Sequence, residues 1–156
     1  MNPDVFIGLL GSPSTATAVQ DMLKACGART IPRLKRGDVD AYVEVPKRGL
    51  YFVFTDEAYQ RNIKKAQIGV SPIILSNVTM YCAAADNYQP YADTLPFGLA
   101  GSDGQSAVHA KLGPPEVADD ETLSDRWTLR DVWLIVTYRG NRQALHEVSL
   151  QLPDAA

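Results

Sequence analysis

The sequence predicts an α+β fold in which a unit of one helix and three antiparallel strands occurs twice in tandem. The two units would form a curved sheet with the helices on one face. Residues 12–27 and 95–115 each combine a helix start signal, an amphipathic run and a closing glycine. Each stretch precedes three segments with strand-like patterns. Setting Leu23 against Leu112 also aligns the two helices, which indicates an internal duplication.

We expect a single domain spanning residues 1–156, with pseudo-repeats at residues 1–85 and 86–156. A chain of 156 residues buries about 70% of the surface that its unfolded form exposes, which is enough for one core. Residues 83–96 contain two tyrosines and two prolines. We therefore expect this segment to be an ordered linker between the halves rather than a flexible one.

The first half begins with a short helix that Asn2 and Pro3 can start. The apolar side of this helix is expected to consist of Val5, Phe6, Leu9 and Leu10. A second helix is expected over residues 12–27, with Ser12 as its N-cap and Pro13 in the first helical position. Its apolar stripe consists of Ala18, Val19, Met22, Leu23 and Cys26.

Three strands are expected in the first half, at residues 38–45, 50–54 and 74–82. The alternation of side chains assigns to the core Val39, Ala41, Val43, Val45, Leu50, Phe52, Phe54, Val78, Met80 and Cys82. It assigns to the opposite face Asp40, Tyr42, Glu44, Tyr51, Val53, Thr79 and Tyr81. The polar residues 56–71 are expected to form an excursion with one helical turn.

In the second half, Ser102 and Gln105 have the spacing of a capping box and predict a helix that ends at Gly113. The acidic residues 116–125 are expected to form a loop. Strands are expected at residues 126–129, 132–138 and 145–152. The middle one of these is almost wholly apolar, so we expect it to be covered on both faces. The last one aligns with the third strand of the first half through the pairs Leu75–Leu145, Val78–Val148, Thr79–Ser149 and Met80–Leu150.

Charge and composition limit the classes of function. The net charge of −3 and the isoelectric point near 5.3 argue against a nucleic-acid partner. No segment has the length of a transmembrane helix, and the first residues lack the basic start of a secretory signal. We therefore expect a cytoplasmic protein with no membrane partner. Cys26 and Cys82 fall on apolar faces and are expected to be buried free thiols.

The residue patterns predict no catalytic, cofactor or metal site, and we expect a protein that is not an enzyme. His109 and His146 lack neighbours at metal-ligand spacing, and the sequence contains no nucleophile motif or phosphate loop. A hydrolase that uses His109 or His146 is an alternative, as is a divalent cation at the acidic residues 119–121.

The face of the predicted sheet opposite the helices is expected to bind another protein. It combines exposed aromatic rings with carboxylates, and Tyr and Trp commonly anchor protein interfaces. The expected partner-binding residues are Asp40, Tyr42, Glu44, Tyr51, Tyr81, Asp119, Asp120, Glu121 and Trp133.

Two resemblances carry the expectation further. The pattern in residues 95–153 resembles that of the β-lactamase-inhibitor protein and of small outer-membrane-assembly lipoproteins of the SmpA/OmlA type, through Val108, Leu112-Gly113-Pro114, Trp127, Leu134, Val136, Tyr138, Gly140, Leu145 and Val148. The whole chain is similar to bacterial immunity proteins encoded beside polymorphic or type VI secretion toxins, through Leu9-Leu10-Gly11, Gly27, the Leu-x-Phe-x-Phe-x-Asp run at residues 50–56, and residues 88–96.

The second resemblance implies an immunity protein that binds and neutralises a cognate toxin, encoded by the adjacent gene, by blocking its active site. Aromatic anchors would occupy the centre of the interface and Asp119, Asp120 and Glu121 its rim. The sequence has no lipobox, which separates this function from envelope assembly. The alternative is a small-ligand-binding or structural module of the same fold without a toxin partner. That alternative predicts a hydrophobic pocket between the helices and the sheet.

Overall fold

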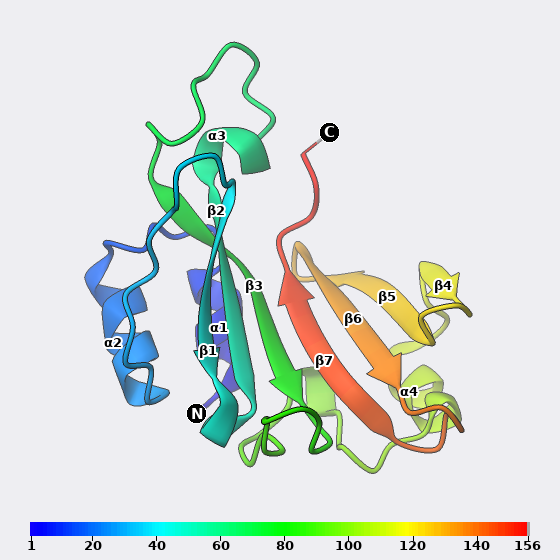
Figure 1. Ribbon diagram of the computed structural model, residues 1–156. Helices are drawn as coiled ribbons and strands as arrows, with labels where there is room; N and C mark the ends of the chain where they lie inside the picture. The colour runs from blue at the N-terminus through cyan, green and yellow to red at the C-terminus, as the bar shows by residue number, and fades with distance from the viewer. Residues whose placement is uncertain (156) are drawn as a thin grey trace.

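The computed structural model describes residues 1–155, and these form an α+β fold around one antiparallel sheet of seven strands (Figure 1). The strand order is β1-β2-β3-β7-β6-β5-β4. The strands are β1 (Asp40–Val45), β2 (Leu50–Asp56), β3 (Ile73–Tyr81), β4 (Val117–Asp119), β5 (Ser124–Leu129), β6 (Val132–Tyr138) and β7 (Leu145–Gln151). The helices are α1 (Pro3–Leu9), α2 (Thr17–Ala25), α3 (Glu57–Gln60) and α4 (Gln105–Leu112), with 3₁₀ turns η1 (Pro46–Arg48) and η2 (Pro96–Gly98). The predicted α+β class is confirmed.

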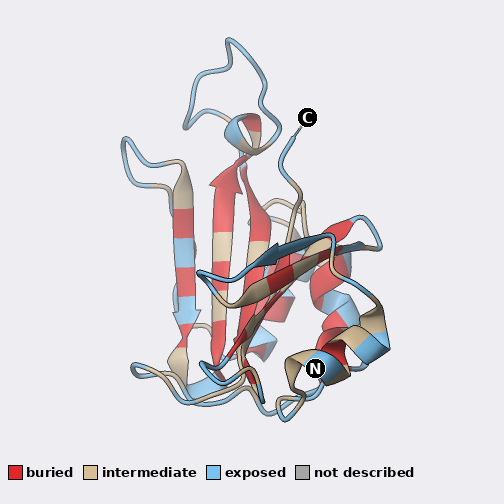
Figure 2. Cartoon of the chain, turned by 90° about the vertical axis from the view of Figure 1, so that its right-hand side faces the viewer, coloured by how far each residue is buried: buried red, intermediate tan, exposed pale blue. Residues whose placement is uncertain are grey.

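One hydrophobic core lies between the sheet and the helices α1, α2 and α4. Phe6, Met22 and Val108 from these three helices pack in the same buried cluster as Phe52 of β2 and Leu134 of β6. Figure 2 shows the buried positions along the strands and on the helices. Each large side chain buried in this way contributes about 1.5–3 kcal/mol relative to an exposed one. The cluster therefore joins both ends of the sheet into one body.

The strands β3 and β7 meet at the centre of the sheet. Thr79 lies opposite Ser149, and on either side Val78 lies opposite Leu150 and Met80 lies opposite Val148. The third strand of each half predicted from the sequence is therefore in the middle, and β1 and β4 are the two outer strands. Figure 1 shows that the strand direction turns strongly from β1 to β4, as accumulated twist requires.

The expected alternation holds in the strands, with corrections at particular positions. In β1 and β2 the inward residues are buried as predicted. Strand β6 is not covered on both faces, because every second residue is only partly buried, including Trp133 and Ile135. Thr79 points outward in register but is only 6% exposed, since it lies between central strands. The predicted acidic loop contains β4, which pairs with β5.

The start of α2 differs from the prediction. Ser12 and Pro13 are not its cap and first residue, because the helix begins at Thr17 with Ala16 as an N-cap that makes no side-chain hydrogen bond. Instead the Leu75 N–H donates to the Ser12 carbonyl at 2.9 Å, and the Gly11 N–H donates to the Leu75 carbonyl at 2.8 Å. Strand β7 pairs only with the later part of β3. The earlier part needs other backbone partners, and residues 11–14 supply them.

Other helix expectations were partly wrong. The Ser102 side chain does not cap α4, whose N-cap is Gly104. In α1, Phe6 is buried and Leu9 and Leu10 pack against the core as expected, but Val5 is 40% exposed and Ile7, which was not assigned to the stripe, is buried. In α2, Ala18 is exposed, while the rest of the expected stripe is buried. The polar excursion contains the expected helical turn as α3.

The linker between the halves is packed against the sheet end, as expected. The Gln89 N–H donates to the Pro46 carbonyl at 2.8 Å, and the Tyr91 N–H donates to the Tyr81 carbonyl at 2.7 Å. Cys26 is buried and free, as predicted, whereas Cys82 is free but only partly buried. Among the described residues, no helix is both long and apolar enough to cross a membrane.

Candidate functional site

The strand register places a continuous set of side chains on the face of the sheet opposite the helices. Glu44 of β1 lies opposite Tyr51 of β2, and Tyr51 lies opposite Thr79 of β3. Tyr81 of β3 lies opposite Glu147 of β7. Neighbouring strands are about 4.8 Å apart, so these side chains are in contact range across the sheet. We call this surface the open face.

Tyrosines and glutamates gather at the β1–β3 end of the open face. We call this group the tyrosine–carboxylate patch; it consists of Tyr42, Glu44, Tyr51, Tyr81, Tyr88 and Glu147. The rings of Tyr42 and Tyr51 stack with centroids 5.8 Å apart and an interplanar angle of 20°. The rings of Tyr81 and Tyr88 have centroids 4.4 Å apart. Such pairs hold one another in place and present rigid, amphipathic surface.

The local environment raises the pKa of three tyrosines of the patch, Tyr51, Tyr81 and Tyr88. Burial, with smaller contributions from Tyr42 and Glu44, raises the pKa of Tyr51 to about 12. Burial also raises the pKa of Tyr81 and of Tyr88, and the carboxylates of the patch add to both effects. The hydroxyl groups are therefore neutral at physiological pH and can donate hydrogen bonds.

Glu44 and Glu147 give the patch its negative charge. Within residues 1–155, neither carboxylate forms an ion pair. Burial raises the pKa of Glu147, and the neighbouring His146 counteracts this only in part. Glu147 is half-buried, and a carboxylate in that position without an ion pair costs free energy, whereas Glu44 is exposed and shares a hollow with Arg33 and Lys35. A positively charged group from outside the chain would reduce that cost.

The centre of the open face carries short polar side chains. The Thr79 hydroxyl lies 2.8 Å from the Ser149 hydroxyl, and it also donates to the Asn77 side-chain oxygen at 2.8 Å. Beside it, the Thr55 hydroxyl donates to Asp40 at 2.7 Å. Asp40, Thr55 and Thr79 line a shallow hollow of about 370 Å³ between β1 and β7. Asp40 is therefore on the open face, as expected, but its carboxylate already accepts a hydrogen bond from Thr55.

The β5–β6 end of the open face has a different character. The guanidinium carbon of Arg126 lies 3.9 Å from the ring centroid of Trp133, in a cation–π contact. Trp133 is half-buried beneath this contact. The predicted anchor is on the expected face but is covered on one side by an arginine.

The acidic residues Asp119, Asp120 and Glu121 are not beside the tyrosines. They lie in β4 and the turn after it, at the sheet edge opposite to β1. Asp119 accepts hydrogen bonds from the backbone of Glu121 and Thr122 at 2.9 and 3.2 Å. Asp120 pairs with Arg142 at 3.0 Å. The structure therefore brings together six of the nine predicted residues on one face and leaves these three at its far edge.

Tyr88 and Glu147 were not among the predicted partner-binding residues. The alternation of β7 places Glu147 outward, so the signal for it was present in the sequence. Tyr88 belongs to the linker, which has no strand period, and only its contact with Tyr81 places it on the open face.

A buried carboxylate was missed as well. Asp125 is 2% exposed and lies on the core side of β5. Its Oδ2 accepts from the Tyr138 hydroxyl at 2.8 Å and from the Gln105 amide at 3.2 Å, and His109 Nε2 is 2.7 Å away. The cluster joins α4 to β5 and β6. Asp125 shares its side of β5 with Trp127, two residues on, so the strand period could have located it.

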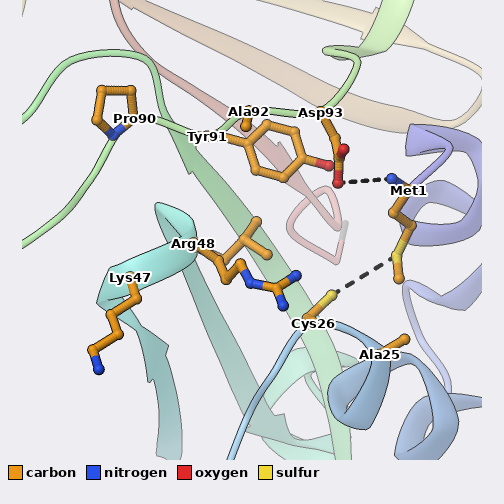
Figure 3. Close-up of a pocket in the computed structure, with 10 residues that line it drawn as sticks. Met1, Ala25, Cys26, Lys47, Arg48, Pro90, Tyr91, Ala92 and Asp93 are labelled. Carbon is orange, nitrogen blue, oxygen red and sulfur yellow. Dashed lines mark hydrogen bonds and ion pairs between the residues drawn. The ribbon is translucent and has the colours of Figure 1, made fainter.

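A small pocket of about 270 Å³ lies at the C-terminal end of α2 (Figure 3). Its lining includes Cys26, Arg48 and Tyr91. The Tyr91 hydroxyl is buried and has no hydrogen-bond partner within residues 1–155. Burial raises the pKa of the Cys26 thiol to about 11, although the N-terminal amino group and Arg48 lower it. The thiol is therefore protonated at neutral pH.

Among residues 1–155, no group of three or more His, Cys, Asp and Glu side chains is arranged to hold a metal ion. No family model, no curated protein and no solved structure matches the chain.

Proposed function

We propose that this chain is an immunity protein that binds a cognate bacterial toxin through the open face and blocks the toxin's active site. The observation that supports this best is the tyrosine–carboxylate patch, in which two aromatic pairs lie beside two glutamates that form no ion pair within residues 1–155. We infer that the partner is a toxin from the resemblance of the sequence to those of immunity proteins. We propose that binding takes place in the cytoplasm.

The charges of the patch specify the kind of toxin surface that would bind. Lysine or arginine side chains of the toxin would pair with Glu44 and Glu147 and contact the tyrosine rings. The tyrosines would contribute large contact areas with little loss of conformational entropy. A basic substrate-binding cleft, such as that of an enzyme acting on anionic substrates, would fit this face.

The open face is comparable in area to such an interface. Seven strands spaced about 4.8 Å apart span about 29 Å, and six residues of a strand extend about 20 Å. The resulting area of about 600 Å² is that of a flat plane, and the accessible surface of the protruding side chains adds to it. Stable complexes bury about 800 Å² on each partner. Blocking an active site in this way needs no catalytic group on the immunity protein.

We also propose that the fold consists of two pseudo-repeats, residues 1–85 and 86–156. The strand order supports this, because β1-β2-β3 and β5-β6-β7 are arranged alike on the two sides of the β3–β7 pair, with β4 added at the edge of the second half. The register supports it as well. Thr79 and Ser149, which the sequence alignment equates, lie opposite each other, as a two-fold axis between repeats would require.

Co-expression with the product of the adjacent gene tests the proposed function. We expect a complex that survives purification and restores growth. Replacing both Tyr42 and Tyr51 by Ala should weaken the complex at least a hundredfold, since truncating each such aromatic anchor costs about 2–4 kcal/mol of binding free energy. Val70→Ala, at an exposed apolar residue in the loop between α3 and β3, serves as the control. A complex that tolerates the double replacement would contradict the proposed site, and failure to bind would contradict the function.

The small-ligand alternative has less support. The pocket in Figure 3 is about 270 Å³, just below the range of about 300–1,000 Å³ typical of ligand sites. Two larger hollows, of about 540 and 570 Å³, lie on either side of Glu44, but they are more open to solvent than this pocket. Its buried Tyr91 hydroxyl and the nearby Arg48 would suit an anionic ligand. A thermal shift with small carboxylates that is lost in Arg48→Met would favour this alternative.

A further inference from the structure

Three sulfur atoms meet at the C-terminal end of α2. Cys26 Sγ lies 3.8 Å from Met1 Sδ and 3.9 Å from Met22 Sδ. Met22 and Cys26 are four residues apart and therefore face the same side of the helix. Met1 reaches them from the segment before α1, and its amino group pairs with Asp93 at 2.7 Å (Figure 3). The chain has only three methionines, and two of them contact this cysteine.

The two separations from Cys26 Sγ fit sulfur ligands of one metal ion. A metal with bonds of about 2.3 Å to three sulfurs in a plane holds those sulfurs about 4.0 Å apart. The two separations in the structure, 3.8 and 3.9 Å, are already close to this value. Little rearrangement of the side chains would be needed, and methionine side chains adapt readily.

The chemistry of the ligands selects the metal. Thiolate and thioether sulfurs are soft donors that favour Cu(I) over hard cations such as Mg²⁺ and Ca²⁺. Structural zinc sites use four cysteine or histidine ligands, whereas two of these three donors are thioethers. We propose that Met1, Met22 and Cys26 form a binding site for Cu(I).

The pocket beside the cluster provides the route of entry. Met1 and Cys26 both line it, so an ion can reach these two residues from solvent, and Met22 lies behind Cys26 in the core. On binding, the thiol proton leaves to solvent and Cu⁺ takes its place, so the net charge of the site does not change. A neutral site is compatible with the guanidinium of Arg48, which also lines the pocket. The proposal stands independently of the toxin partner.

The test is an anaerobic titration of the full chain with Cu(I) in competition with the chromophoric chelator bicinchoninate. We expect the wild-type chain to withdraw one Cu(I) per molecule. Cys26→Ser and Met22→Leu should each weaken binding at least tenfold. The matched controls are Cys82→Ser and Met80→Leu, which alter the other free cysteine and the remaining methionine, and both should bind as the wild type does.

Met22→Leu preserves side-chain volume, so its fold should be retained even if Cys26→Ser is unstable. Circular dichroism of each variant checks this. X-ray absorption of the loaded chain should show sulfur neighbours alone, at about 2.3 Å. The sulfurs would merely be packing atoms if the wild type withdraws no Cu(I), if Met22→Leu binds equally well, or if the bound copper has nitrogen or oxygen neighbours instead of sulfur.

Discussion

Thr79 and Ser149 lie opposite each other at the centre of the sheet, and their hydroxyl oxygens are 2.8 Å apart. Thr79 belongs to β3 and Ser149 to β7, so this contact joins the two strand groups at the seam between them. The seam also forms the floor of the open face. The hydrogen bonds of these two hydroxyl groups should contribute measurably to the free energy of unfolding.

Thr79→Val should lower the free energy of unfolding by about 1 kcal/mol, because the methyl group cannot replace the hydrogen bonds to Ser149 and Asn77. Ser149→Ala should cost less, since Ser149 is partly exposed and water can reach its partner. The double variant should cost less than the sum of the two. Urea denaturation of all four proteins provides the cycle, and strictly additive costs would show that the two hydroxyls do not interact.

Asp125→Ala should destabilise the fold by about 3 kcal/mol, because the buried Tyr138 hydroxyl and the partners on α4 lose their acceptor. This corresponds to a decrease in Tm of about 6–12 °C for a domain of this size. Tyr138→Phe should cost about 1 kcal/mol. Asp21→Ala, at an exposed position of α2, is the control, and a similar Tm for Asp125→Ala and Asp21→Ala would remove the cluster's structural role.

Stability should fall as the pH rises above about 10. The pKa of Tyr51 is raised to about 12, and burial followed by Asp125 raises that of Tyr138 further. The unfolded chain therefore loses these protons at lower pH than the folded chain, which favours unfolding in this range. Urea midpoints measured from pH 8 to pH 12 should show the decrease, with a smaller slope in Tyr138→Phe. An equal slope in that variant would contradict the assignment to Tyr138.

Gly49→Ala should destabilise the fold by about 3 kcal/mol. Gly49 has a φ of +66°, and an added Cβ would overlap the Gln89 carbonyl oxygen and lie 2.6 Å from the Tyr91 nitrogen. The left-handed conformation alone accounts for about 1 kcal/mol. Gly69→Ala is the matched control, since Gly69 has a φ of +92° with no atom within 4 Å of the added Cβ. Equal losses for the two variants in urea denaturation would show that the linker does not pack closely on this turn.

Glu147→Gln should stabilise the isolated chain and weaken its complex. Burial raises the pKa of Glu147 above its ordinary 4.5, so the charged form disfavours folding once the pH exceeds that value, and the amide removes this effect. The same change removes a charge that the proposed partner would pair with. Tm at neutral pH and binding kinetics at two salt concentrations measure both effects. Asp120→Asn, at the far edge of the sheet, should leave the dissociation rate unchanged; the reverse pattern would place the interface at β4.

The amino-acid sequence determined the elements whose signal is local. Strand residues alternate between two faces because successive side chains point in opposite directions, so the buried and exposed sides of β1, β2 and β7 were predicted correctly. The same period put Tyr42, Glu44, Tyr51 and Tyr81 on one face. The stripe of α2 was also predicted, since Val19, Met22 and Cys26 recur at helical spacing.

Only the tertiary structure decided where distant segments meet. The strand order separates Asp119 from the tyrosines by the full width of the sheet, although no local pattern distinguishes the two ends. The backbone of β3 forms hydrogen bonds with residues 11–14, and α2 therefore starts later than the sequence predicts. The packing of the linker places the ring of Tyr88 against that of Tyr81. The two sulfurs around Cys26 likewise come from Met22 of α2 and from the first residue of the chain. These contacts join residues that are far apart in sequence. The hydrogen-bonding groups and side chains involved find their partners only when the whole sheet has formed, so no local pattern predicts them.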